Sequence, residues 1–481
     1  MLFIYWFRKD LRLEDNRGLS EFLSKVSGSC KFSLIYIKNE NTFNYFGEKR
    51  ILFLNNTLSE LEAGLTSYNL HLQLIRGKST DVFNSLINKY GQISLYYNKQ
   101  IEPYCIKRDR LVKEIVESKN GMICDFNDST IFEPGEIKND SGEQYKVYTP
   151  FKKNALNRLE KNHYVNVKTD LNLIDSGNEV IVEINTDSEI KTGKYELIEK
   201  SYFSGGRKEG LSLLKDFYTT GISEYKIKRD IPSVNGTSRL SAHLHFGTVS
   251  IREALRTAVT ALEKSKKESD AAGIQTWINE LLWREFYYHI TYFNPQLISE
   301  SFRKEYDGLK WSYNEIHFDK WSKGITGYPI VDAGMRQLNS EGWLHNRVRM
   351  IVAMFLTKDL FIDWRLGEKY FAEKLIDLDF ASNNGGWQWC ASTGVDAQPY
   401  FRIFNPYLQS KKFDPDGSYI KKYIPELKDL PPEYVHEPDL MNESEQRKFN
   451  VIIDKDYPRR MVDHSKVRDN VISEFKKISY N

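Results

Sequence analysis

Hydrophobic residues in the first 130 positions form short runs that are separated by amphipathic stretches. The runs are nearly continuous, as buried parallel strands require, and lie at Leu2–Phe7, Phe32–Ile37, Leu70–Ile75, Ile93–Tyr97 and Met122–Phe126. Between them, stretches such as Glu48–Leu65 and Asp81–Lys89 place apolar residues at helical spacing. This alternation predicts an α/β domain over residues 1–130 that contains a five-stranded parallel sheet.

The pattern changes after residue 130. Residues 131–195 have no sustained periodicity and predict a long connector that is anchored at Tyr145–Phe151. Residues 196–481 are helical in pattern nearly to the end, as in Ile274–Phe293, where apolar residues recur at i, i+3, i+4, i+7 and i+8. We therefore expect an α/β domain, a connector and a large all-helical domain. The first domain is Rossmann-like in shape only, because no GxGxxG follows its first strand.

Composition indicates an ordinary globular protein. The chain has 481 residues, a formal net charge of +2 and a mean hydropathy of −0.55. Its apolar runs are far shorter than the roughly 20 residues that span a bilayer, and the N-terminal segment lacks the features of a signal peptide. Four dispersed cysteines without a CxxC exclude a zinc ribbon and argue against a disulfide scaffold. We expect a cytoplasmic protein that does not enter a membrane.

Aromatic residues are concentrated in the helical part, where eight of nine tryptophans lie at or after Trp277. A large aromatic core explains this, and a site that uses rings for stacking or electron transfer is the alternative. Glu280, Trp283, Arg284 and Tyr287 share the helix face opposite the apolar stripe. They predict either a Glu280–Arg284 surface pair beside packed rings or the rim of a cavity for a planar ligand.

The segment Thr237–Ser241 precedes a predicted helix near His243–Leu255. Hydroxyl groups at a helix start cap free backbone N–H groups, and the same N–H groups together with an arginine can bind an anion such as phosphate. Both interpretations stay open from the residues alone.

Two later segments carry polar groups on helical faces. Asn346, Arg349 and Met350 share one face, and Asp377 and Asp379 follow. An ion pair with Arg349 accounts for the carboxylates, and a metal site is not expected because no histidine cluster accompanies them. The string at residues 383–389 joins paired glycines to two tryptophans, and packing alone gives no reason for it.

These strings resemble the photolyase/cryptochrome family, and most closely its class I cyclobutane pyrimidine dimer DNA photolyases. The likeness covers almost the whole chain and is weakest in the connector and near residues 440–455. The matching strings occur in order at Trp6–Leu13, Thr237–Ser241, Asn279–Tyr287, Thr326–Leu338, Gly342–Met350, Asp363–Glu368 and Asn383–Pro406.

The resemblance implies that the helical domain binds FAD. The implied FAD-binding residues are Tyr225, Thr237, Ser238, Arg239, Leu240, Ser241, Trp277, Asn346, Arg349, Asp377, Asp379 and Asn383. It also implies a buried Arg349–Asp377 pair and places Asn383 at flavin N5, where a neutral amide can hydrogen-bond the reduced ring. Trp387, Trp364 and Trp311 match the family's electron-transfer chain from the flavin toward the surface, and three core tryptophans are the alternative.

The implied activity is light-dependent DNA repair, a deoxyribodipyrimidine photo-lyase reaction. Excited FADH⁻ donates an electron to a cyclobutane pyrimidine dimer that has left the duplex stack, the ring opens, and the electron returns. The implied catalytic residues are Glu280, Asn383, Trp283 and Met350. The implied DNA-binding residues are Arg229, Glu280, Trp283, Arg284, Tyr287, Asn346, Arg347, Trp389, Arg402 and Gln409.

The family also implies a light-harvesting chromophore in the α/β domain. Tyr104-Cys105 stand where folate-binding members have an Asn-Glu pair, and the loop Lys38–Gly47 is short and lacks their histidine. These departures favour 8-hydroxy-deazaflavin over methenyltetrahydrofolate, with a flavin as a third possibility.

Three related functions are weighed against dimer repair. A (6-4) photolyase has two histidines where this chain has Asn346 and Met350, and a DASH-type protein does not match the string at 383–389. The main alternative is a cryptochrome photoreceptor without repair activity, which often has a long C-terminal tail, whereas the end of this chain resembles that of the catalytic core. We expect a monomer in a bacterial or archaeal type of cell, with dimer-containing DNA as its partner.

Overall fold

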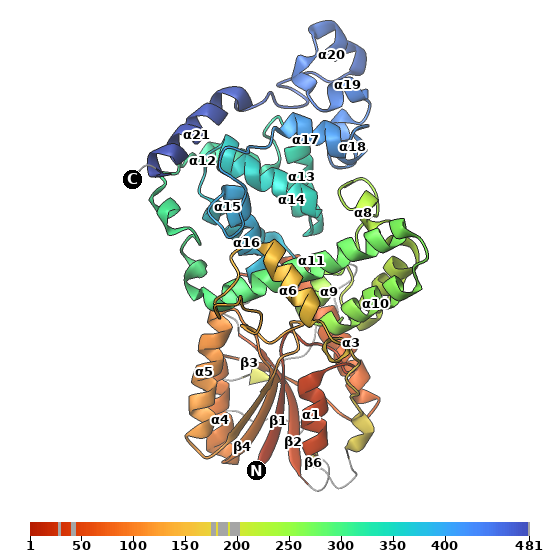
Figure 1. Cartoon of the computed structure of the whole chain (residues 1–481), viewed down its shortest axis with the longest axis vertical. Coiled ribbons are helices and arrows are strands. Elements are labelled where there is room, and N and C mark those ends of the chain that lie inside the picture. Colours follow the sequence, from red (N-terminus) through yellow and green to blue (C-terminus); the bar gives the residue numbers. More distant parts are fainter. Residues whose placement is uncertain (27–29, 40–44, 175–178, 181–190, 193–202, 480–481) are drawn as a thin grey trace. The chain divides into compact units, whose positions relative to one another are not determined.

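The computed structural model describes residues 1–26, 30–39, 45–174, 179–180, 191–192 and 203–479. The chain divides into two compact units (Figure 1). Unit 1 consists of Met1–Ser223 and Ser238–Pro295, and unit 2 of Glu224–Thr237 and Gln296–Asn481. The first helices of the expected helical domain therefore group with the sheet, whereas the sequence pattern separated them from it.

Unit 1 contains a parallel sheet whose main strands follow the order β5-β4-β1-β2-β3. The strands are β1 (Leu2–Phe7), β2 (Lys31–Lys38), β3 (Leu72–Arg76), β4 (Ile93–Asn98) and β5 (Met122–Phe126). The predicted five-stranded parallel sheet is confirmed, with β3 displaced by one or two residues from its expected position. Two short strands that the sequence did not predict, β6 (Glu179–Val180) and β7 (Lys191–Thr192), pair with β2 and β3.

Helices cover both faces of this sheet, because successive side chains of a strand point to opposite sides. Leu2, Ile4 and Trp6 of β1 pack into one apolar cluster with side chains of α4 and α5. Tyr5 points the other way, and its ring lies 5.7 Å from that of Phe22 in α1. The helices of unit 1 are α1 (Arg17–Lys25), α3 (Glu48–Thr66), α4 (Ser79–Tyr90), α5 (Pro103–Glu117), α6 (Tyr148–Arg158), α7 (Arg207–Asp216), α9 (Ser241–Phe246), α10 (Ile251–Lys264) and α11 (Glu268–Phe293).

Hydrogen bonds and ring contacts attach the predicted connector to α11. The Tyr148 hydroxyl at the start of α6 donates to the carbonyl of Asn279 at 2.7 Å. The fully buried carboxylate of Glu285 accepts the backbone N–H groups of Ile131 and Phe132, both at 3.0 Å. The anchor expected at Tyr145–Phe151 is therefore present, although as a helix. Much of the polar stretch after residue 174 lies outside the described residues.

A buried ionic network joins α10 to the loop that follows β1. The guanidinium groups of Arg12 and Arg252 both pair with Asp128, and Arg252 also pairs with Asp15. Although burial acts to raise the pKa of Asp128, these two guanidinium groups hold it well below its usual range. The network explains why α10 belongs to the same compact unit as the sheet.

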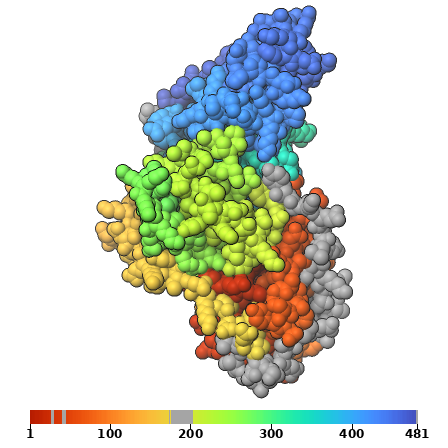
Figure 2. All heavy atoms as spheres, turned by 90° about the vertical axis from the view of Figure 1, so that its right-hand side faces the viewer, coloured from red at the N-terminus to blue at the C-terminus, as the bar shows by residue number. Residues whose placement is uncertain are grey.

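An open groove of about 480 Å³ has α10 on one side. On its other side lie α7 and the π-helical turn Phe217–Gly221 that follows α7. Lys215, Arg256 and Lys264 line it together with Tyr218. These segments appear in yellow-green and green in Figure 2.

Unit 2 is helical and is organised around an aromatic core. Trp321, Trp364 and Trp387 are buried in one cluster with Tyr328 and Phe371. The helices are α8 (Tyr225–Lys228), α12 (Glu315–Lys323), α13 (Pro329–Glu341), α14 (Asn346–Met354), α15 (Trp364–Lys374), α16 (Phe380–Ala391), α17 (Pro406–Phe413), α18 (Ser418–Tyr423), α19 (Pro432–Val435), α20 (Glu443–Phe449) and α21 (His464–Ser479).

Candidate functional site

The expected site residues are distributed over both units. In unit 1, Gly247 ends α9 with a φ of +69°, and a Cβ there would lie 2.1 Å from the carbonyl oxygen of Lys9. The helix predicted near His243–Leu255 is therefore two helices. Leu240, at the N-cap of α9, has an apolar side chain and makes no side-chain capping bond, and the hydroxyl-cap and anion-binding interpretations of Thr237–Ser241 both stay predictions.

Helix α11 carries the aromatic face that the sequence singled out. The Trp283 ring is partly exposed and stacks on Tyr148 of α6, with ring centroids 3.6 Å apart and planes 13° from parallel. Tyr287 lies 5.8 Å from Trp283 on the same face. One side of the Trp283 ring is therefore covered by the protein, and its orientation is fixed before any ligand binds.

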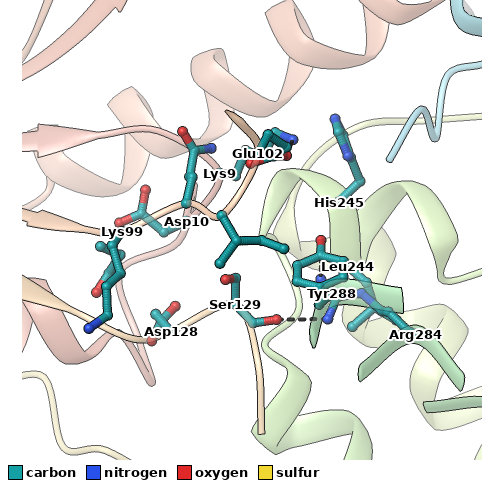
Figure 3. A pocket seen from close by; sticks show the side chains of 13 residues that line it. Lys9, Asp10, Lys99, Glu102, Asp128, Ser129, Leu244, His245, Arg284 and Tyr288 are labelled. Atoms are coloured by element: carbon teal, nitrogen blue, oxygen red, sulfur yellow. Dashed lines mark hydrogen bonds and ion pairs between the residues drawn. The ribbon is translucent and has the colours of Figure 1, made fainter. Parts of the chain in front are cut away.

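Arg284 points into a small cavity at the carboxyl ends of β1 and β4, where the strand order reverses (Figure 3). Its guanidinium donates to the carbonyl of Ser129 at 2.7 Å and to the Tyr288 hydroxyl at 2.8 Å. His245 also lines this cavity, and burial, followed by the charge of Lys9, lowers its pKa well below the usual value. The cavity volume is about 20 Å³, which is room for about one water molecule.

In unit 2, α14 presents the arginine that was expected to form an ion pair. The Arg349 guanidinium contacts both carboxylate oxygens of Asp377, at 2.8 and 3.1 Å, and its Nε donates to the carbonyl of Leu344 at 2.8 Å. The expected pair is present, and Asp377 is buried. Asn346, the first residue of α14, is exposed.

Helix α16 positions Asn383 through two hydrogen bonds. Asp379 caps the helix by accepting the N–H of Ser382 at 2.8 Å. The Asn383 Nδ2 group donates to the backbone carbonyl of Glu368 at 3.2 Å, which fixes the orientation of the amide. Burial raises the pKa of the neighbouring Glu368 carboxyl to about 7. A Cβ added to Gly386, one turn along the helix, would meet no atom within 4 Å.

The three tryptophans of the expected chain differ in exposure. Trp387 and Trp364 are 2% and 1% exposed, whereas Trp311 is only partly buried. A Cβ on Gly367 would lie 2.2 Å from the Trp387 ring, so glycine permits this ring to approach α15. The ring contacts of Trp387 are with Trp321 and Phe371, and those of Trp311 are with Phe361 and Phe475.

The residues expected to contact DNA have different environments. Arg402 is exposed, and Met350, Trp389 and Gln409 are partly exposed. Arg347 is instead held inside unit 2, because its guanidinium pairs with Asp230 at 2.9 Å and lies 4.4 Å from the Phe413 ring. Arg229 is 3.9 Å from Asp230, and Tyr225 is buried under its guanidinium. Trp277 is buried against Phe217.

Sequence reasoning missed four residues that shape these sites. Tyr148 was expected only as part of an anchor, and its stacking on Trp283 has no signal in the sequence. Trp321 was not distinguished from the other tryptophans. His345, whose side chain caps α14 by accepting the N–H of Arg347, lies inside a matching motif. Glu368 also ends a matching motif, so a signal for it existed.

Both the N-terminal and the C-terminal part of the chain match models of known protein families. Residues 3–169 match the DNA photolyase family model, and residues 277–477 match the FAD binding domain of DNA photolyase. The deoxyribodipyrimidine photo-lyase of Alkalihalophilus pseudofirmus is 38% identical over 98% of this chain and 97% of its own length. That of Escherichia coli is 37% identical over 98% of both chains.

The chain is also similar to solved structures over nearly its whole length. A class III photolyase from Agrobacterium tumefaciens aligns with a TM-score of 0.88 and 32% identity, covering 100% of this chain and 98% of its own. An archaeal photolyase from Sulfolobus tokodaii, solved with two FAD molecules, has a TM-score of 0.80 and 35% identity over 99% of this chain and 100% of its own. A Synechocystis cryptochrome has a TM-score of 0.88 and 26% identity over 98% of both chains.

The sheet, the helical part and these matches define a two-part protein with a flavin-binding helical region. The chain belongs to the DNA photolyase family. Within the described ranges, no helix is long and apolar enough to cross a membrane. The same residues contain no group of three histidine, cysteine or acidic side chains that could bind a metal ion.

Proposed function

We propose that this protein uses light to split cyclobutane pyrimidine dimers in DNA. The observation that carries the proposal is the full-length likeness to relatives named deoxyribodipyrimidine photo-lyase, together with a partly exposed tryptophan, Trp283, held ready for stacking. The positions where a (6-4) photolyase has its histidines contain Asn346 and Met350.

The residues of unit 2 fit a bound FAD. Arg349 and Asp377 form a preassembled charged pair, and Gly386 leaves free space on α16. When bound, FAD supplies the light-excited electron that opens the cyclobutane ring. The resemblance assigns its phosphates to Arg239 and the neighbouring hydroxyl groups, because a cation and the backbone N–H groups at a helix start favour an anion.

Asn383 would orient the flavin through its amide oxygen. Nδ2 already donates a hydrogen bond to the carbonyl of Glu368. Oδ1 is therefore the atom that remains to accept a hydrogen bond from an N–H group, such as that of flavin N5 in the reduced state. A carboxylate in this position would face the Glu368 carbonyl with an acceptor and lose that hydrogen bond. This accounts for an amide rather than an acid at residue 383.

Recognition of the lesion would combine stacking with phosphate contacts. Trp283 and Trp389 would stack on the flipped bases, Glu280 would bind a base edge, and Met350 would close the pocket. Arg402 is exposed and would contact phosphate, which sets register and salt dependence without reading sequence. The pairing of Arg347 with Asp230 supports a positioning role for Arg347 rather than a phosphate contact.

We also propose a light-harvesting chromophore in the α/β part, with 8-hydroxy-deazaflavin preferred because of Tyr104-Cys105. A solved relative contains two FAD molecules, so a flavin is the competing chromophore. Part of the loop Lys38–Gly47 that entered this preference, residues 40–44, lies outside the described residues. Mass spectrometry of the chromophore released from purified protein decides between them.

The test of function is dimer repair by the purified, reduced protein in blue light and in darkness. Loss of dimers in light alone, from double-stranded or single-stranded DNA, supports the proposal. Bound FAD without light-dependent loss of dimers from either DNA would overturn it and favour a photoreceptor. Light scattering tests the expected monomer against the chain mass of 56.4 kDa. A repair enzyme is expected with the DNA, in the cytoplasm of a bacterial or archaeal type of cell.

A further inference from the structure

The groove between α7 and α10 lies within unit 1 and contains none of the residues expected to bind flavin or DNA. Its volume of about 480 Å³ is within the range of about 300–1,000 Å³ that is typical of small-molecule sites. Three cationic side chains line it, and no acidic residue is among the described residues that do so. Asp216 and Glu263 are exposed and lie outside the lining. This charge favours an anionic ligand.

Two of the cations are exposed lysines in the last turns of their helices, Lys215 in α7 and Lys264 in α10. Within the part of the chain that the structure describes, neither ammonium group forms an ion pair. Lys264 makes one long hydrogen bond, to the Tyr218 hydroxyl at 3.4 Å. A cation in the last turn offsets the partial negative charge of the helix C-terminus. Both ammonium groups can still exchange water for the oxygens of an anion.

Arg256 supplies a third cation, and its position is fixed. Its Nη1 donates to the carbonyl of Tyr164 at 2.7 Å, and its Nη2 lies 3.7 Å from a carboxylate oxygen of Asp15. Asp15 is already paired with Arg252 at 3.1 Å, so it neutralises Arg256 only in part. A guanidinium has five N–H donors in one plane, and pairs of such donors match the oxygens of a phosphate.

An aromatic ring lines the same groove. Tyr218 belongs to the π-helical turn Phe217–Gly221, a rare conformation that is frequent at functional sites. Phe217 anchors this turn, because its buried ring lies 5.0 Å from the Trp277 ring. Tyr218 is half-buried, and Leu211 and Leu214 add apolar surface to the lining. A ring beside apolar surface is suited to the flat face of a nucleobase.

We propose that this groove binds a free nucleoside polyphosphate, with the nucleobase against Tyr218 and the phosphates among Lys215, Arg256 and Lys264. A nucleic-acid strand fits less well, because strand-binding grooves take about 4–16 nucleotides, whereas 480 Å³ suits one small molecule. An acidic peptide would satisfy the cations but has no flat group for Tyr218. The inference concerns binding alone and does not depend on light-driven repair.

Isothermal titration calorimetry of the FAD-loaded full-length protein with ATP tests the proposal, because bound FAD keeps ATP out of the flavin site. We expect adenosine and inorganic tripolyphosphate, which each supply half of the ligand, to bind more weakly than ATP. The Lys215→Gln/Lys264→Gln variant should lose about tenfold or more in affinity for ATP and for tripolyphosphate, because it lacks two charge-assisted contacts. Lys266→Gln removes one positive charge just outside the groove and is the matched control, with unchanged affinity expected.

The aromatic contact is tested separately from the charges. Tyr218→Leu should weaken ATP binding by about fivefold or more and leave the affinity for tripolyphosphate unchanged. Tyr218→Phe keeps the ring and should bind ATP nearly as well as the natural protein. Equal losses of ATP affinity in both variants would refute stacking on Tyr218, and so would an equal loss of ATP and tripolyphosphate affinity in Tyr218→Leu.

Two further results would overturn the inference as a whole. One is absence of ATP binding to the FAD-loaded protein, or equal ATP affinity in the natural protein and the double-lysine variant. The other is an undamaged single-stranded oligonucleotide that binds more tightly than ATP and loses this advantage in the double-lysine variant, which would make the groove a strand-binding site. Bound FAD, measured by absorbance, shows that each variant is folded. If the double variant loses FAD, Lys215→Gln alone decides. Light-dependent loss of dimers tests the proposed function independently of these titrations.

Discussion

Replacing Tyr148 by leucine is expected to weaken the preference of this protein for dimer-containing DNA, although Tyr148 is not among the residues assigned to DNA. Its ring covers one side of Trp283 at a centroid distance of 3.6 Å. Without that partner, Trp283 gains rotational freedom that it must lose again when a flipped base stacks on it. Undamaged DNA offers no flipped base, so its binding should change little.

The size of this effect follows from the lost preorganisation. Fixing a mobile side chain at an interface costs about 0.5–1.5 kcal/mol, which is also the approximate range for an aromatic pair beyond its buried area. Each tenfold change in Kd corresponds to about 1.4 kcal/mol. The ratio of the Kd for undamaged DNA to the Kd for dimer-containing DNA should therefore fall by about 2- to 12-fold. Trp283→Ala removes the stacking surface itself, worth about 1–3 kcal/mol per base, and should cost more.

Equilibrium titration of the purified variants against dimer-containing and undamaged DNA measures this ratio. Tyr148→Phe is the matched control, because it keeps the ring but loses the hydroxyl bond to the Asn279 carbonyl. We expect Tyr148→Phe to retain most of the preference. In a Trp283→Ala background, Tyr148→Leu should have almost no further effect on the ratio.

Three results would refute this reasoning. Equal losses in Tyr148→Leu and Tyr148→Phe would show that the hydroxyl bond, and not the stacked ring, matters. A full effect of Tyr148→Leu in the Trp283→Ala background would show that Tyr148 acts independently of Trp283, and an unchanged preference in Trp283→Ala itself would place the lesion elsewhere.

Other residues give equally direct tests. Arg402→Ala should weaken binding to damaged and undamaged DNA alike, and the slope of log binding constant against log salt concentration should become shallower by about one. A loss of affinity confined to damaged DNA would contradict a phosphate contact. Trp387→Phe should abolish photoreduction of oxidised FAD but spare repair by pre-reduced protein, and photoreduction at the natural rate would show that Trp387 is misassigned. Gly367→Ala should lower the free energy of unfolding by about 1–3 kcal/mol, because its Cβ would overlap the Trp387 ring; denaturant titration checks this, and an unchanged midpoint would refute the tight contact. Burial lowers the pKa of His345 to about 4, so the unfolded chain binds its proton first as pH falls below about 6.5. Protonation of His345 in the unfolded chain should therefore lower the free energy of unfolding by about 2 kcal/mol between pH 7 and pH 5. His345→Asn, which can still cap α14, should lose less stability over this range, and denaturant unfolding of both proteins at the two pH values measures the difference.

The sequence by itself determined the local elements and the family. The strands β1, β2, β4 and β5 were recognisable because buried parallel strands leave continuous apolar runs. The helix face with Glu280 and Trp283 followed from its periodicity alone. The long motifs identified the family and pointed to Arg349, Asp377 and Asn383, because side chains that bind a shared cofactor recur at fixed positions.

Only the tertiary structure decided which of these elements meet. The break at Gly247 arises from a close approach to the carbonyl of Lys9, which no local pattern records. Tyr148 stacks on Trp283 across 135 positions, and Trp321 faces Trp387 across 66. Such contacts depend on how whole helices pack, and ring packing is a property of two surfaces rather than of either segment. For this reason the sequence named the tryptophans, but the structure determined which of them are neighbours.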